Sequence, residues 1–205
     1  MHDPSPSRLR DRIKQQTQAA ILDAAEVMLV ADGLATARID AIAARAGVSV
    51  GTLYNHFADR EALIAAVMDR NLETMLEDLE AVELQPAPTT QEDLRRFLAC
   101  FDRHFADHGP FIALMMNMGP QTPAWACRRD GFMQVLLRIA RVVVDRGITR
   151  GDLRPDCPDL LAAALPALGR LFLIRSTSAV PVVVSIEPLL SLLLHGATAS
   201  GRNPD

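Results

Sequence analysis

The sequence predicts an all-α protein, and three observations lead to this prediction. Apolar residues recur at intervals of three and four along most of the chain, the period of a helix with one buried face. The residues are 49% hydrophobic but only 4% aromatic, so the core consists mainly of small and aliphatic side chains that favour helices. The only strand candidate is Val180-Pro-Val-Val-Val184, and Pro181 weakens it.

The first expected helix follows a stretch rich in Pro and Ser, residues 1–8, which we expect to be disordered. Ile13, Ile21 and Leu29 mark its apolar face, and Gly33 ends it. A cluster of basic residues stands at the start of this helix, namely Arg8, Arg10, Arg12 and Lys14. This cluster favours phosphate attraction, and the alternative is a solvated tail.

Residues 39–57 predict two short helices joined by a tight turn. Ile39, Ile42 and Ala46 repeat at helical spacing in the first helix. Gly47 can turn with positive φ at no steric cost, and Ser49 is a good N-cap for the second helix. The pattern indicates a helix-turn-helix.

The second of these helices has a polar outer face. Leu53 and Phe57 are expected to be buried, which turns the remaining side chains outward: Thr52, Tyr54, Asn55 and His56. A short helix with such a face, on a compact helical support, fits the major groove of DNA. We therefore expect Asn55 and His56 to read base edges, and Thr52, Tyr54 and Arg60 to anchor phosphates.

Further helices fill the remaining chain and bring the expected total to about nine. A long helix starts near Asp59 and ends before the linker Pro86-Ala-Pro88. His108-Gly109-Pro110 is expected to stop the next helix. The remaining expected helices are residues 90–107, 111–118, 123–146, 156–179 and 182–196. We expect a DNA-binding domain over residues 1–58 and a helical effector-binding and dimerisation domain over residues 59–205.

The last two expected helices are apolar nearly all round. Such helices must be buried on every side, and a chain this small cannot easily cover both. We therefore expect a homodimer through these two helices, with a monomeric core as the alternative. A two-fold dimer would place two recognition helices about 34 Å apart, facing successive major grooves.

Residues Ile21 to Leu63 resemble the amino-terminal domain of the TetR-type transcriptional regulators. The matching pieces are Ile21-Leu22-Asp-Ala-Ala25, Gly33, Ile42-Ala43-Ala-Arg-Ala-Gly47-Val48-Ser49, Gly51-Thr52-Leu53-Tyr54-Asn-His56-Phe57 and Arg60-Glu61-Ala-Leu63. Arg38 departs from the pattern, because a small hydroxyl residue commonly opens the second helix there and touches a phosphate. The resemblance implies DNA contacts by Arg38, Ser49, Val50, Gly51, Thr52, Tyr54, Asn55, His56 and Arg60.

Net charge argues mildly against nucleic-acid binding, since the chain carries −4. Residues 1–70 hold eight basic and nine acidic side chains, so even the expected DNA-binding domain is near neutral. The placement of the basic residues, rather than the net charge, decides phosphate attraction.

The compartment follows from the cysteines and the apolar runs. The three cysteines are odd in number and widely spaced, which favours reduced thiols in the cytoplasm: Cys100, Cys127 and Cys157. The chain start lacks the apolar core of a signal peptide. The most apolar run, residues 160–179, is interrupted by Pro166, Arg170 and Arg175, so no membrane association is expected.

Two patterns suggest chemistry other than DNA binding. Gly47-Val-Ser49-Val-Gly51 matches a hydrolase nucleophile motif, but that motif needs a preceding strand, so no catalytic residue is expected. Cys100, His104 and His108 lie four residues apart and could hold a metal ion from one side of a helix. A polar stripe facing a cavity or an interface is the alternative for these three residues.

Aromatic and Met residues concentrate in one part of the chain. Phe97, Phe101 and Phe105 repeat every four residues, as in a plain core or in the lining of an apolar ligand pocket. The candidate pocket residues are Phe101, His104, Phe105, Met115, Met116, Trp125, Phe132 and Arg175.

Together these features predict a cytoplasmic, homodimeric regulator that needs no cofactor. It would be a repressor released from a palindromic operator in double-stranded DNA by a small apolar effector. The alternatives are an activator, a metal-responsive regulator, and an enzyme or carrier that uses the helical pocket.

Overall fold

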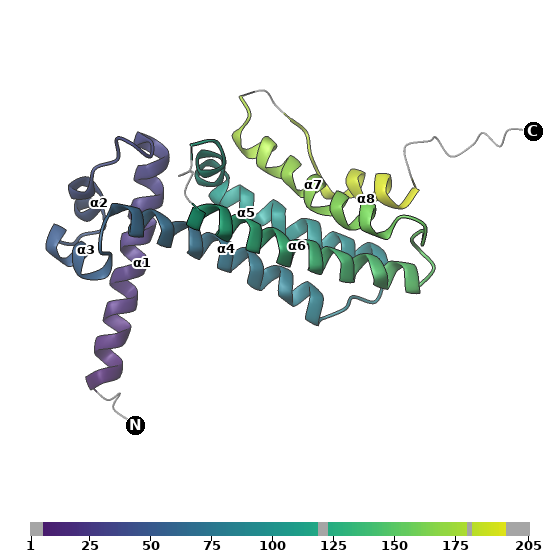
Figure 1. Cartoon of the computed structure of the whole chain (residues 1–205), viewed down its shortest axis with the longest axis horizontal. Coiled ribbons are helices and arrows are strands. Elements are labelled where there is room, and N and C mark those ends of the chain that lie inside the picture. The colour runs from purple at the N-terminus through teal and green to yellow at the C-terminus, as the bar shows by residue number, and fades with distance from the viewer. Residues whose placement is uncertain (1–5, 119–122, 180–181, 196–205) are drawn as a thin grey trace, which may run out of the picture. The chain divides into compact units, whose positions relative to one another are not determined.

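A computed structural model describes residues 6–118, 123–179 and 182–195 (Figure 1). These residues contain helices and no strand, which confirms the all-α prediction. The helices are α1 (Pro6–Asp32), α2 (Ile39–Arg45), α3 (Val50–His56), α4 (Arg60–Leu84), α5 (Thr90–Met118), α6 (Pro123–Thr149), α7 (Pro158–Thr177) and α8 (Ile186–His195).

The described helices number eight rather than about nine, because α5 does not stop at Gly109-Pro110. Proline removes one helical hydrogen bond and crowds the preceding turn, which makes a helix end there the natural expectation. Beyond the proline, however, Phe111, Ile112 and Met115 are all buried. Their burial offsets the lost hydrogen bond and keeps the helix continuous.

The chain forms two compact units. The first comprises Met1–Leu72 with Pro110–Gly119, and the second comprises Glu73–Gly109 with Pro120–Asp205. The long helices α4 and α5 contribute residues to both units.

The core of the first unit draws on four helices. Its fully buried side chains include Ile21 of α1, Ile42 of α2, Leu53 of α3 and Leu63 of α4. Polar contacts tie α1 to α4 at the edge of this core, since the Arg70 guanidinium lies 2.6 Å from Asp23 and 3.0 Å from Glu26.

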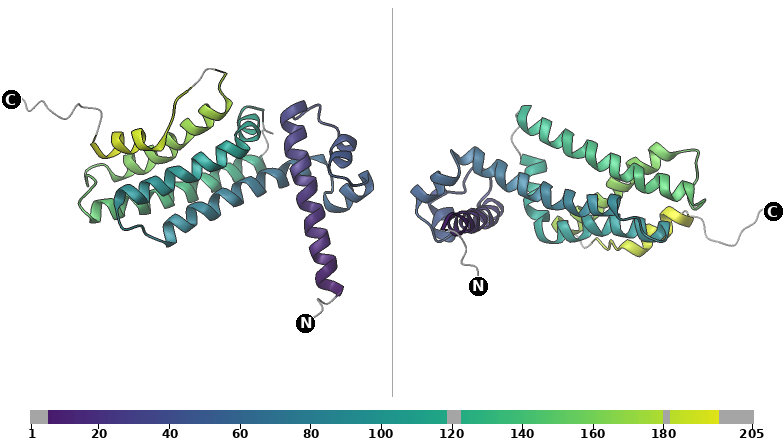
Figure 2. Two further views of the ribbon diagram at one scale, coloured as in Figure 1. Left: turned by 180° about the vertical axis from the view of Figure 1, so that it is seen from behind. Right: turned by 90° about the horizontal axis from the view of Figure 1, so that it is seen from below.

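The second unit is a helical bundle in which α6 and α7 pack along each other (Figure 2). Gly169 lets α7 approach α5 closely, because a Cβ atom there would lie 2.5 Å from the Phe101 ring of α5. Asp93 is fully buried and lies 2.7 Å from Arg150 and 3.8 Å from Arg146. Arg146 also donates to the Val82 carbonyl oxygen at 3.0 Å, so this ion-paired cluster fastens the end of α4 to α6.

By length and composition alone, α7 could cross a membrane. Pro166 lies inside α7 without ending it, and Leu165 and Phe172 are buried within the second unit. One face of α7 is therefore packed into the core of the bundle.

Candidate nucleic-acid interface and effector region

The turn between α2 and α3 depends on Gly47, which has φ +71°. The Val48 amide donates to the Ala43 carbonyl at 3.0 Å, and the Gly47 amide donates to the Ala44 carbonyl at 3.1 Å. This pair of hydrogen bonds is the Schellman arrangement that ends a helix through a left-handed residue. The predicted turn is confirmed, and it fixes the direction in which α3 leaves α2.

Ser49 caps α3 as the sequence predicted. Its hydroxyl oxygen accepts the Thr52 amide hydrogen at 3.0 Å and lies 2.9 Å from the Thr52 hydroxyl oxygen. Both hydroxyl groups are therefore engaged in holding the first turn of α3, and α3 starts rigidly at the expected residue.

The outward side of α3, which we name the recognition face, consists of Val50, Gly51, Tyr54 and Asn55. All four residues are exposed; Val50 is 39% and Tyr54 47% accessible. On the opposite side Leu53 is completely buried. The recognition face therefore offers a phenol, a carboxamide and bare backbone to a partner, without disturbing the core.

His56 lies at the edge of the recognition face and is half-buried. Its Nδ1 atom is buried and has no hydrogen-bond partner among the described residues. The ring lies 6.3 Å from that of Phe57, measured between centroids. His56 can therefore address a partner only through Nε2.

Arg38 is the N-cap of α2 by backbone conformation, but its side chain makes no capping hydrogen bond. Instead its guanidinium is paired with Asp40, at 3.0 Å from Nε to Oδ1 and 2.8 Å from Nη2 to Oδ2. The Asp40 carboxylate also accepts the Ala41 amide hydrogen at 3.0 Å. Hydrogen bonding to Arg38 lowers the pKa of the Asp40 carboxyl, so the pair is ionised at neutral pH.

Arg60, a predicted phosphate anchor, is half-buried and faces the loop before α2. Its guanidinium donates to the Leu34 carbonyl oxygen and, at 3.2 Å, to the Ala37 carbonyl oxygen. These contacts join the start of α4 to the loop that leads into the helix-turn-helix. The sequence contains no pattern that predicts this role, because the partners are backbone atoms more than twenty residues away.

The aromatic cluster of the second unit is closely packed. The rings of Phe97 and Phe101 lie 5.4 Å apart, and those of Phe101 and Phe105 lie 5.8 Å apart, between centroids. All three side chains are buried, and the Phe101 ring also lies against Gly169. The described side chains thus fill this region in the present conformation.

The other predicted effector residues are not all brought together. His104 is buried beside Phe105, with ring centroids 5.9 Å apart, whereas Trp125 and Phe132 are half-exposed on α6. Met115 is buried and Met116 exposed, and both belong to the first unit.

Arg175 already has several partners. Its guanidinium carbon lies 5.2 Å from the centroid of the Phe172 ring, and its nitrogens donate to the Asp102 carboxylate and, at 2.9 Å, to the Val184 carbonyl oxygen. Asp102 is a half-buried residue of α5. Its pairing with Arg175 joins α5 to α7 and to the segment before α8.

The metal-responsive alternative finds no support. Among the described residues, no three His, Cys, Asp or Glu side chains gather closely enough to hold a metal ion. His104 and His108 lie together, with ring centroids 5.1 Å apart, but the buried Cys100 thiol donates instead to the Arg96 carbonyl at 3.2 Å. Burial also raises the pKa of the Cys100 thiol to about 11, which disfavours the thiolate that a metal requires.

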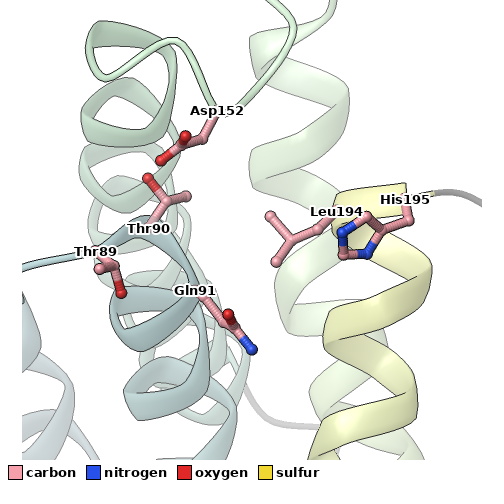
Figure 3. A pocket seen from close by; sticks show the side chains of 6 residues that line it. All are labelled: Thr89, Thr90, Gln91, Asp152, Leu194 and His195. Carbon is pink, nitrogen blue, oxygen red and sulfur yellow. The ribbon is translucent and has the colours of Figure 1, made fainter.

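A pocket of about 340 Å³ lies elsewhere in the second unit. Thr89, Thr90 and Gln91 line it from the start of α5, and Asp152 lines it from the turn before α7 (Figure 3). Leu194 and His195 at the end of α8 form the opposite wall. None of these residues belongs to the predicted effector cluster, and the sequence shows no motif that joins them.

Comparison with known families matches both parts of the chain. Residues 21–67 match the model described as bacterial regulatory proteins, tetR family. Residues 86–182 match the model described as tetracyclin repressor-like, C-terminal domain.

One relative of known name is the HTH-type transcriptional regulator EthR of Mycobacterium tuberculosis. It is 27% identical over 184 residues, which covers 87% of this chain and 83% of EthR.

Two solved structures share the fold. FadR from Bacillus subtilis, in complex with stearoyl-CoA, has a TM-score of 0.67 at 18% identity, covering 88% of this chain and 99% of FadR. AibR, in complex with isovaleryl coenzyme A and operator DNA, has a TM-score of 0.67 at 17% identity, covering 87% of this chain and 98% of AibR.

Proposed function

We propose that this chain, which belongs to the TetR family of ligand-responsive bacterial transcriptional regulators, is a cytoplasmic homodimeric repressor. In this proposal the recognition face binds a palindromic operator, and a small apolar effector releases the protein from DNA. Residues 1–58 would form the DNA-binding domain and residues 59–205 the effector-binding and dimerisation domain. We assign the chain no catalytic residue and no cofactor.

The observation that carries the DNA-binding assignment is the exposure of Tyr54 and Asn55 on a helix whose geometry is fixed by Gly47 and Ser49. Rigid placement lowers the entropy cost of binding, because the contacting side chains are already oriented. Asn55 and His56 are the proposed base readers, and Val50, Gly51, Thr52 and Tyr54 surround them. Arg38 is a proposed phosphate contact, whereas Ser49 and Arg60 position the helices.

The dimerisation assignment is supported by a stripe of exposed residues along α7 that is apolar except at one position. These residues recur at helical spacing, namely Leu160, Ala163, Ala167, Ile174 and the charged Arg170. The small alanines would let a second helix approach closely, and the adjacent α8 exposes Leu192. Uncovered apolar side chains at this spacing favour burial against another helix.

The effector assignment is supported by the aromatic cluster around Phe101 and Phe105. An apolar chain could replace these packed side chains only if the cluster opened, which would couple binding to a change of conformation. Because FadR and AibR are seen with acyl-CoA molecules, we propose that the effector carries an acyl chain. His104, Met115, Met116, Trp125, Phe132 and Arg175 are the remaining candidate contacts.

The test combines DNA binding with two named ligands. A duplex selected from random sequences by the purified protein would be titrated by fluorescence anisotropy, alone and with stearoyl-CoA or isovaleryl-CoA. The proposal expects at least one of these ligands to weaken binding about tenfold or more. Phe105→Leu should retain DNA binding and lose much of the ligand effect, while the exposed control Met133→Leu should retain both. Unchanged DNA binding with both ligands would contradict an acyl-chain effector.

A further inference from the structure

The first turns of α1 extend beyond the core of the first unit. Residues 8–16 are all exposed, and Ile21 is the first fully buried residue of the helix. Figure 1 and Figure 2 show this part of α1 running past α2 and α3. We name residues 8–20 the α1 arm; at 1.5 Å per residue it is about 20 Å long.

The α1 arm is strongly basic in an acidic protein. Its cations outnumber its single carboxylate, Asp11, by three, whereas the whole chain carries −4. The remaining residues therefore carry −7. The four cations are Arg8, Arg10, Arg12 and Lys14.

Arginines elsewhere in the described chain are mostly neutralised by carboxylates. Arg70, Arg95 and Arg103, for example, lie within 3.0 Å of acidic side chains. The arm cations, in contrast, form no ion pair with any described residue. Their charge is therefore available to an outside anion.

The cations flank an exposed apolar pair. Leu9 is 52% and Ile13 53% accessible, and helical geometry places them one above the other on one face. Arg8 and Arg12 lie on one side of this pair, and Arg10 and Lys14 lie on the other. Two apolar residues are too few for stable insertion into a lipid surface, which needs a large apolar face.

We propose that the α1 arm is a second DNA contact, whose four cations bind backbone phosphates outside the base pairs reached by α3. The inference depends on the proposed DNA-binding function and deepens it. Duplex DNA presents one negative charge per 1.7 Å of axis, so an arm of this length spans several phosphates. Contacts of this kind add affinity without adding sequence preference.

The test is the variant R8Q/R10Q/R12Q/K14Q, compared with the full chain on a selected operator duplex and on a scrambled duplex. Each lost phosphate contact should make the slope of log K against log salt shallower by about 0.9, hence up to about 3.6 for the four cations of one protomer and about 7.2 for a bound dimer. Affinity for the two duplexes should fall by similar factors. The control R103Q/R129Q/R138Q/R154Q removes the same charge from exposed positions of the second unit and should leave the slope unchanged.

Three outcomes separate the possibilities. If the unaltered protein binds neither duplex, the proposed function itself fails. If it binds and the arm variant keeps the same slope, with unchanged helix content by circular dichroism, the arm inference is overturned. The inference is equally overturned if the arm variant binds DNA like the unaltered protein and loses only binding to phosphatidylglycerol vesicles. The variant L9Q/I13Q should retain DNA affinity, because the proposal assigns binding to the cations.

Discussion

The exposed ion pair between Arg38 and Asp40 lies at the start of the helix-turn-helix and allows a sharp test. The Asp40 carboxylate holds the Arg38 guanidinium through two hydrogen bonds of 3.0 and 2.8 Å. It also places a negative charge beside the surface that we propose meets DNA. Asp40→Asn removes this charge and keeps an oxygen that can accept the Ala41 amide hydrogen, so α2 should start as before.

Releasing Arg38 should add about one neutralised phosphate per protomer, hence two in the complex of a dimer with DNA. Two phosphates steepen the slope of log K against log salt by about 1.8, so lowering salt from about 200 to 50 mM should favour the variant by about 12-fold relative to wild type. The measurement is a salt series of anisotropy titrations on one selected operator duplex. Glu73→Gln, an exposed carboxylate on α4, is the control for net charge alone.

Two results would contradict a phosphate contact by the released Arg38. A slope identical to that of wild type would mean that Arg38 gains no phosphate when Asp40 is neutralised. A gain that persists in the double variant Arg38→Ala/Asp40→Asn would assign the effect to lost repulsion rather than to the freed guanidinium.

Three further predictions concern the recognition face, the dimer and the cysteines. Tyr54→Ala should weaken operator binding by about 1–3 kcal/mol without changing thermal unfolding, because the side chain is 47% exposed; an unchanged titration would remove Tyr54 from the interface. Leu192 is 45% exposed, so Leu192→Arg should give folded monomers in sedimentation, and a dimeric variant would contradict the proposed interface. Leu190 is only 1% exposed, so Leu190→Arg should unfold the chain. At pH 8 a maleimide should label the exposed Cys127 and spare the buried Cys100, because burial raises the pKa of the Cys100 thiol to about 11. Equal labelling rates for the two thiols would contradict the burial of Cys100.

Local patterns predicted the helix-turn-helix well, because its geometry depends on nearby residues. The positive φ of Gly47 and the capping by Ser49 involve partners within a few positions, and both are readable from residue type and spacing. The burial of Leu53 followed from helical periodicity in the same way.

Long-range contacts were less predictable. Pro110 carries a strong local signal for a helix end, which the burial of Phe111 overrides. Ile13 fits the apolar period of α1 but lies on the exposed arm, because period alone does not show how far a core extends. The contacts of Arg175 with Asp102 and Val184 join segments that no sequence spacing relates.

DNA binding of the proposed kind requires that the recognition face of α3 reads a specific DNA sequence. The most direct measurement is selection of duplexes from a random library by the full-length protein, followed by sequencing, for wild type and for Asn55→Ala. We expect wild type to enrich a two-fold symmetric sequence and Asn55→Ala to lose preference at defined positions of each half-site. No enriched sequence, or the same sequence with the same preferences for the variant, would contradict this expectation.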